Sequence, residues 1–221
     1  MLVKLEVLDT IYLKDPESSD LGKRIIEQGI LLIDEIGFEA FTFNKLGAKI
    51  GSNESSIYRY FENKHKLLLY LNYWYWSWLE YQLVFETNNV SDSLEKLKRA
   101  LTVVTRKVEE DTNFSHVNEV VLNRIIIHEN SKVYLSKKVD KENSDGLFTS
   151  HKRVIDRLST IIQEVNSDYQ YPITLASTVI DGALHQHFIN NHFKALTNCS
   201  ETLSTTDFFI NLTLKTIQHN A

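Results

Sequence analysis

The stretch from Thr42 to Leu68 reads TFNKLGAKIGSNESSIYRYFENKHKLL, and it predicts two short helices, a tight turn and the start of a third helix. Thr42 predicts the start of the first helix, because its hydroxyl can accept a hydrogen bond from a free backbone N–H. Gly51 predicts the end of that helix, because glycine adopts the left-handed conformation at little cost. Asn53 is a second N-cap, so a new helix is expected from Glu54. Two helices joined by a short turn that contains glycine match the helix-turn-helix, a DNA-binding unit.

The apolar residues of both helices are spaced four apart, which places each pair on one helical face. Leu46 and Ile50 form the pair on the first helix, and Ile57 and Phe61 form the pair that holds the second helix to its support. The alternative interpretation is a small helical hairpin in an ordinary core, because glycine turns between short helices are common.

The outer face of the second helix carries small polar residues near its N-terminus, Ser55 and Ser56. Small residues let a recognition helix approach the major groove, where the base edges carry the sequence information. Asn63 can cap a third helix, which puts Lys64 at or near its first position. A helix N-terminus with a lysine attracts phosphate through the helix dipole and through charge.

The run SSIYRYFENKHKLL, residues 55–68, resembles the TIYRHF-like run and Lys-led helix that are typical of the tetracycline repressor (TetR) family. Upstream, KRIIEQGILLIDEIGFEAFTFNKLGAKIG resembles the family's first helix, a break at Gly37 and Phe38, and its second helix. The resemblance covers roughly residues 20–70. The chain departs from the family at Gly47, where Ala is usual, and at Ser52, which replaces a small aliphatic residue in the turn. An interior glycine should weaken a helix by up to about 1 kcal/mol.

The resemblance implies a cytoplasmic, dimeric transcriptional regulator, a repressor that binds a palindromic operator and is released by a small apolar or aromatic effector. Four side chains are expected on phosphates: Thr42, Tyr58, Tyr60 and Lys64. Ser55 and Ser56, with Glu54 or Arg59, are expected to contact bases. Lys45 is also expected to bind DNA. The competing function is a helical ligand- or protein-binding module whose helix-turn-helix no longer binds DNA.

The charge pattern supports a local rather than a general affinity for nucleic acid. A net charge of −5 argues against a chain that coats DNA. Between Thr42 and Leu68, however, five basic residues stand against two acidic ones, a local charge of +3 that can steer the unit onto a phosphate backbone. Cys199 is the only cysteine, which excludes an intramolecular disulfide and fits a reducing cytoplasm. We find no signal peptide and no uncharged apolar run long enough for a membrane span.

We expect an all-α fold, because the chain has only two prolines and no sustained alternation of apolar residues beyond its N-terminus. The domains expected are an N-terminal extension (1–18), a three-helix DNA-binding domain (19–66) and a larger effector-binding and dimerisation domain (67–221). Val3, Leu5 and Val7 alternate with charged residues, which suits a short edge strand or an extended arm packed on the body. The helices expected outside the DNA-binding unit span about 19–36, 64–86, 92–110, 115–129, 131–141, 149–166, 173–194 and 204–218.

The segment from Tyr70 to Phe85 contains all three tryptophans. Trp74, Trp78 and Tyr81 lie on one helical face, and their apolar bulk with a polar tip suits a wall that holds a flat or apolar ligand. Core packing is the alternative for these aromatics, and for any single one it is favoured.

The last two long helices are the candidates for a dimer interface, because each has an apolar side. The first side comprises Ile173, Ala176, Val179, Ile180, Ala183, Leu184 and Ile189, and the second comprises Phe208, Phe209, Leu212, Leu214 and Ile217. The alternative is that both sides complete the monomer core. The TetR resemblance implies that two such helix pairs form a four-helix interface.

No enzyme, metal or cofactor is expected. Asp181 and His185 are four residues apart, but a metal needs three or four converging ligands, and one helix offers two on a face. We therefore favour a polar stripe or an interface role for His185, His187 and His192, which lie in the same predicted helix. The sequence has no nucleophile elbow, phosphate-binding glycine loop or HExxH motif.

Overall fold

The computed structural model describes residues 5–109, 116–200 and 202–218, and within these ranges it contains helices and no strand. The prediction of an all-α fold is confirmed. The chain forms two compact units, residues 1–77 with 108–149 and residues 78–107 with 150–221, so the boundary falls inside one long helix. In the described part of the chain, no helix is long and apolar enough to cross a membrane.

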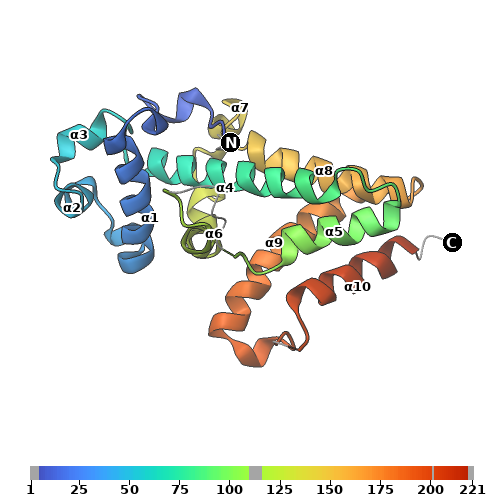
Figure 1. Cartoon of the computed structure of the whole chain (residues 1–221). Helices are drawn as coiled ribbons and strands as arrows, with labels where there is room; N and C mark the ends of the chain where they lie inside the picture. The colour runs from blue at the N-terminus through green and yellow to red at the C-terminus, as the bar shows by residue number, and fades with distance from the viewer. Residues whose placement is uncertain (1–4, 110–115, 201, 219–221) are drawn as a thin grey trace. The chain divides into compact units, whose positions relative to one another are not determined.

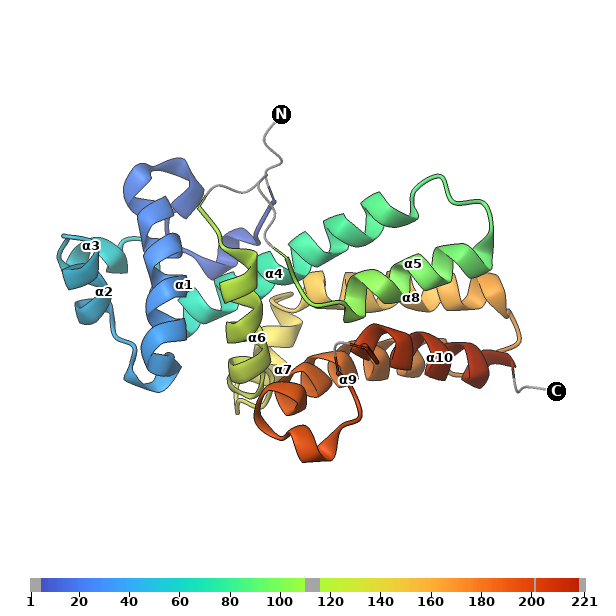
Figure 2. The ribbon, with the colours of Figure 1, turned by 60° about the horizontal axis from the view of Figure 1, so that its bottom comes forward.

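The first unit contains the predicted helix-turn-helix. Its elements are η1 (Asp9–Ile11), η2 (Pro16–Ser18), α1 (Asp20–Ala40), α2 (Phe43–Lys49), α3 (Glu54–Tyr58), the start of α4 (Lys64–Thr87), α6 (Glu119–Tyr134) and α7 (Val139–Ser144). Figures 1 and 2 show α2 and α3 against each other at the outer side of α1, and α6 alongside α1. The helix-turn-helix is therefore packed on α1, and α1 in turn is packed on α6.

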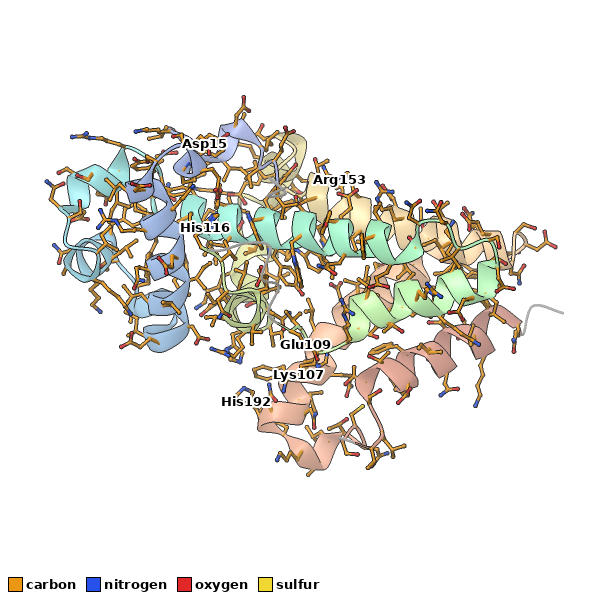
Figure 3. All side chains as sticks on the ribbon, viewed as in Figure 1. Asp15, Lys107, Glu109, His116, Arg153 and His192 are labelled. Atoms are coloured by element: carbon orange, nitrogen blue, oxygen red, sulfur yellow. The ribbon has the colours of Figure 1, made fainter. Side chains whose placement is uncertain are left out.

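The second unit is a helical bundle. It contains the remainder of α4, then α5 (Ser93–Thr105), α8 (Thr149–Val165), α9 (Pro172–His192), η3 (Lys194–Leu196) and α10 (Thr205–Gln218). Helices α5, α9 and α10 pack against one another. The carboxylate of Glu80 on α4 accepts from Arg153 Nε at 2.6 Å and from Arg157 Nε at 2.8 Å, which ties α4 to α8. Figure 3 labels Arg153 at this position.

The predicted N-caps are confirmed. Thr42 Oγ1 accepts from the backbone N–H of Lys45, and Asn53 Oδ1 accepts from that of Ser56. Each cap satisfies a backbone donor that the first turn of its helix leaves without a partner. Gly37 interrupts α1 at φ 74°, so the predicted break is also present.

Two predicted helix boundaries are wrong. Helix α6 runs through residue 130 to Tyr134 instead of ending near Glu129, because Val133 continues its buried side; the separate helix predicted at 131–141 is reduced to the short α7. Helix α5 ends at Thr105, whose carbonyl oxygen accepts from His187 Nε2 at 2.9 Å. The expected helix start at residue 115 and Val3 of the alternating stretch lie outside the described residues.

Helix α4 is buried on every side from Leu67 to Glu80. Its tryptophans are all in the core, whereas Phe85, four residues after Tyr81, is 69% exposed. The spacing of Trp74, Trp78 and Tyr81 therefore shows neither that the helix is buried on all sides nor where it leaves the core.

Candidate nucleic-acid interface

The helix-turn-helix is held by a small apolar core and a close backbone approach. Leu46, Ile57 and Phe61 are fully buried, as their spacing predicted. Helix α3 ends at Tyr58, however, so Phe61 follows the helix instead of lying on it. Gly51 adopts φ 64° in the turn, where an L-residue with a side chain would be strained. A Cβ on Gly47 would lie 2.9 Å from the carbonyl oxygen of Ser52. The turn therefore packs so closely on α2 that the alanine usual in the family would not fit here without a backbone shift.

The polar face of α3 is directed to solvent. Ser55, Tyr58 and Arg59 are exposed, while Glu54 and Ser56 are half-buried. Both the backbone N–H and the hydroxyl of Ser56 donate to Asn53 Oδ1, at 2.8 and 2.7 Å. The hydroxyl of Ser56 is thus used at the helix cap and can still accept a hydrogen bond, whereas Ser55 presents a small exposed side chain near the start of the helix.

Thr42 and Lys45 flank this face at the start of α2, and both are exposed. The ammonium of Lys45 donates to the carbonyl oxygen of Ala40 at 2.8 Å. The exposed Tyr58 packs edge-on against Phe43, with ring centroids 5.0 Å apart. Partial desolvation, with a hydrogen bond to Glu54, raises the pKa of Tyr58 above its ordinary value.

Tyr60 lies inside the unit and not on its surface. Its side chain is 3% exposed, and a 2.8 Å hydrogen bond joins its hydroxyl to Ser19 Oγ. This hydrogen bond lowers the pKa of Tyr60, and burial opposes the shift. The phosphate contact expected for Tyr60 stays a prediction, but in this structure its hydroxyl already has a partner within the protein.

Lys64 caps the end of α1. Its Nζ donates to the carbonyl oxygens of Phe38, Glu39 and Phe41, at 3.0, 3.1 and 3.2 Å, and lies 4.8 Å from the centre of the Phe38 ring. A cation is favourable at this position because the helix dipole is negative at its C-terminal end. The sequence contains one signal for this role, because a break at Gly37 leaves the carbonyls beyond it without helical partners.

Helix α6 supplies site residues that the sequence did not reveal. The backbone N–H of Phe38 donates to Glu129 Oε1 at 3.1 Å, and Lys132 joins Glu129 to Glu39 at 2.7 and 3.0 Å. Burial lowers the pKa of Lys132, but the hydrogen bonds and charges of the two carboxylates outweigh it, so the pKa is raised. These contacts fix the backbone just after the Gly37 break from the α6 side.

A second charged pair reinforces the same junction. Arg124 on α6 donates through Nε and Nη2 to the two carboxylate oxygens of Asp34 on α1, at 3.0 and 2.6 Å. The two-point geometry is the strong form of an arginine–carboxylate pair. Asp34 and Arg124, which are 90 residues apart in the sequence, thus join α6 to α1, the helix on which the helix-turn-helix packs.

The model for bacterial regulatory proteins of the tetR family matches residues 25–71, which include α2, α3 and the start of α4. The DNA-binding unit is that of a TetR-family regulator. The match indicates a DNA-binding transcriptional regulator of that family. The TetR match ends within α4, so the larger part of the chain is characterised by its fold alone.

Solved structures extend the TetR-like fold over most of the chain. Superantigen PfiT is 14% identical, with 94% of this chain and 100% of that one covered and a TM-score of 0.62. A tetR-family protein from Rhodococcus RHA1 is also 14% identical, over 90% and 97% of the chains with a TM-score of 0.60. AibR, solved with isovaleryl coenzyme A and operator DNA, is 16% identical over 86% and 97%, with a TM-score of 0.57. A search of curated proteins found no match.

Replacing Lys64 by Met should lower the free energy of unfolding by about 1–3 kcal/mol, because three carbonyl oxygens lose a charged donor. Methionine keeps the apolar stem beside Phe38. Urea denaturation measures the change, with Lys45→Met as the matched control, because Lys45 is exposed and bonds a single carbonyl. Equal stability of the two variants would contradict the capping role.

The same Lys64→Met variant tests the predicted phosphate contact. A lysine on a phosphate contributes about one unit to the slope of log affinity against log salt concentration. We expect the slope for DNA to fall by about one unit if Lys64 also reaches a phosphate. An unchanged slope would leave Lys64 with the structural role alone.

Proposed function

We propose that this TetR-family chain is a repressor that binds a palindromic operator as a homodimer, with α3 in the major groove. The observation that carries the proposal is the exposed polar face of α3, a helix capped at Asn53 and anchored by Ile57, with Ser55 exposed on it and Arg59 exposed directly after it. A repressor needs only to occupy its operator, so repression is favoured over activation. A regulator that acts on chromosomal DNA in a bacterium works in the cytoplasm.

The parts of the interface divide by chemistry. Ser55 and Ser56, with Glu54 or Arg59, are proposed to face bases, since hydroxyl, carboxylate and guanidinium groups all read base edges in the major groove. Thr42, Lys45 and Tyr58 surround them with exposed hydroxyl and ammonium groups suited to phosphates. AibR has been solved in complex with operator DNA, which supports operator binding by a chain of similar fold.

A selection against random duplex DNA tests the proposal and supplies the operator for every later measurement. We expect an enriched palindrome, because two copies of α3 in a symmetric dimer would read two related half-sites. No enrichment by a folded dimer would favour the alternative function, a helical binding module whose helix-turn-helix no longer contacts DNA.

Ser55→Leu should then weaken binding to the selected operator by about tenfold or more, since a lost or blocked base contact costs about 1–3 kcal/mol. Fluorescence anisotropy with a labelled operator measures the affinity. Ser131→Leu, at an exposed position of α6, introduces the same side chain as a control. Equal affinities for the two variants would exclude this face of α3 from base recognition, provided that both melt like the parent.

The dimer is proposed to form through the exposed apolar residues of α9 and α10. The structure divides the predicted apolar sides into two groups. Buried within the monomer are Ala176, Val179, Ile180, Ala183, Leu184, Phe209 and Ile217, whereas Ile173, Phe208 and Leu212 are exposed. The other two predicted residues, Ile189 and Leu214, are half-buried. Phe208 also borders an open groove of about 380 Å³ with Leu196 and Leu203. Exposed apolar side chains that gather on one pair of helices are typical of an interaction surface.

Phe208→Glu should convert the dimer to a monomer and abolish tight operator binding, because a charge replaces an apolar side chain at the proposed contact. Sedimentation equilibrium measures the mass of the particle. Gln163→Glu, which adds the same charge at an exposed position of α8, is the control and should remain dimeric. A dimer that persists in Phe208→Glu would place the interface elsewhere.

A small apolar or aromatic effector is proposed to act on α4. Trp74 and Trp78 are buried on this helix and Tyr81 is half-buried, so a ligand that reaches them must alter how α4 packs. AibR, a protein of similar fold, has been solved with isovaleryl coenzyme A, which supports a search that includes acyl compounds.

A compound that releases the operator should also change the tryptophan emission, because all three tryptophans lie on α4 and no other helix contributes to the signal. Titration of the DNA-free protein measures this change. A releasing compound that leaves the emission unaltered would place the effector away from the aromatic helix.

A further inference from the structure

Residues 8–19, here called the strap, are an ordered part of the first unit. The strap comprises η1, η2 and the segment between them, and it buries Ile11 and Pro16. Its sequence suggested only an extension packed on the body. The contacts below give it a specific attachment point, the residue Tyr60 that follows the proposed recognition helix.

The strap lies directly on the first turn of α1. A Cβ on Gly22 would overlap the carbonyl oxygen of Pro16 and lie 2.6 Å from its Cα, so the two backbones can approach this closely only with glycine at position 22. Asp15 caps η2 by accepting from the backbone N–H of Glu17 at 2.9 Å. The strap therefore has a defined position on α1.

Three separate contacts join the strap to Tyr60. The backbone N–H of Leu13 donates to the carbonyl oxygen of Tyr60 at 2.8 Å. The ammonium of Lys14 lies 5.0 Å from the centre of the Tyr60 ring, within the range of a cation–π contact. Ser19 Oγ is hydrogen-bonded to the Tyr60 hydroxyl at 2.8 Å. The carbonyl, the ring and the hydroxyl of one residue are thus all held by the strap.

The strap is also fixed to the rest of the first unit. Glu17 Oε1 is 2.7 Å from His116 Nε2 and accepts from the Tyr70 hydroxyl at 3.4 Å. Lys66 donates to the carbonyl oxygen of Thr10 at 3.2 Å. Figure 3 labels Asp15 on the strap and His116 just before α6. Because the strap has these independent anchors, it can transmit a fixed position to Tyr60.

Helix α3 needs such an anchor because it has only five residues. A helix of this length has too few internal hydrogen bonds to be stable by itself, so its orientation depends on what holds its two ends. Asn53 holds the first end, and Ile57 fixes the middle through the core. At the other end, the backbone N–H of Tyr60 donates to Ile57 at 2.9 Å, which links α3 directly to the residue that the strap holds.

We propose that the strap positions the recognition helix for operator binding through Tyr60, without contacting DNA itself. Tyr60 is then a positioning residue, which explains why it is buried despite lying within the DNA-binding motif. The inference rests on the proposed function, because it takes α3 as the recognition helix.

Deletion of residues 1–14 tests the proposal without changing the formal side-chain charge, because the segment carries Lys4 and Lys14 against Glu6 and Asp9. We expect affinity for the selected operator to fall about tenfold or more, while affinity for unrelated duplex DNA and the salt slope stay as in the full chain. Unspecific binding depends on phosphate contacts, which the strap does not supply. Operator affinity equal to that of the full chain would overturn the proposal, as would a fall of the slope by about one unit or more.

Hydrogen exchange in the absence of DNA separates this inference from the proposed function. The deletion should accelerate amide exchange across residues 54–61 and leave α10 unchanged, whether or not an operator has been found. Unchanged exchange across 54–61 would overturn the strap's role. Failure of the full chain to bind any duplex would instead count against the proposed function.

Tyr60→Phe supplies the test if the deletion also loosens α1, because this variant removes only the hydroxyl bonded to Ser19. We expect operator affinity to fall about 2- to 10-fold, the range of one hydrogen bond, with unrelated DNA bound as before. Tyr171→Phe, at an exposed position of the second unit, is the control. An equal loss of affinity for operator and unrelated DNA would show a direct phosphate contact and overturn the positioning role.

Discussion

The break at Gly37 leaves backbone groups without partners inside the helix, and other elements of the first unit supply those partners. Beyond it, the backbone turns out of α1 toward α2, and the carbonyls of Phe38, Glu39 and Phe41 and the N–H of Phe38 need partners outside the helix. Backbone polar groups away from water are expensive to leave unpaired. Lys64 from α4 supplies the donor and Glu129 from α6 supplies the acceptor. One short stretch of irregular backbone thus joins α1, α4 and α6, and α2 and α3 are built on that junction.

The local parts of this arrangement could be predicted from the sequence, because their causes lie within a few residues. The side chains of Thr42 and Asn53 each accept a hydrogen bond from a backbone N–H three residues later, which caps a helix. Gly51 adopts the positive φ that the turn requires. The all-α fold follows from the same kind of signal. The bond between Glu129 and Phe38 has no such signal, since 91 residues separate its two ends. The location of Tyr60 was also not predictable, because the strap that covers it has no recognisable motif.

The two glycines at positions 22 and 47 show a related limit of sequence-based reasoning. Intrinsic propensity counts a glycine within a helix as a loss of up to about 1 kcal/mol relative to alanine. In the folded unit, each one lets a second stretch of backbone approach closely, Pro16 at Gly22 and Ser52 at Gly47. Propensity describes an isolated helix, whereas these positions are determined by what packs against it. The departure from the family at Gly47 is therefore matched to the turn and is not a weakness of the helix.

Electrostatics decides how an acidic chain can still approach DNA. The lysines of the DNA-binding unit make internal contacts, but their partners differ in kind. Lys49 is paired with the carboxylate of Glu35 at 2.8 Å, whereas Lys45, Lys64 and Lys66 donate to neutral backbone carbonyls. A carbonyl fixes an ammonium without cancelling its charge. At physiological salt, charges act over about 8–10 Å, so these three lysines can attract a phosphate backbone without touching it. Lysines that hold the helix-turn-helix together can thus also contribute to its positive field, whereas the exposed face of α3 is the part proposed to distinguish one sequence from another.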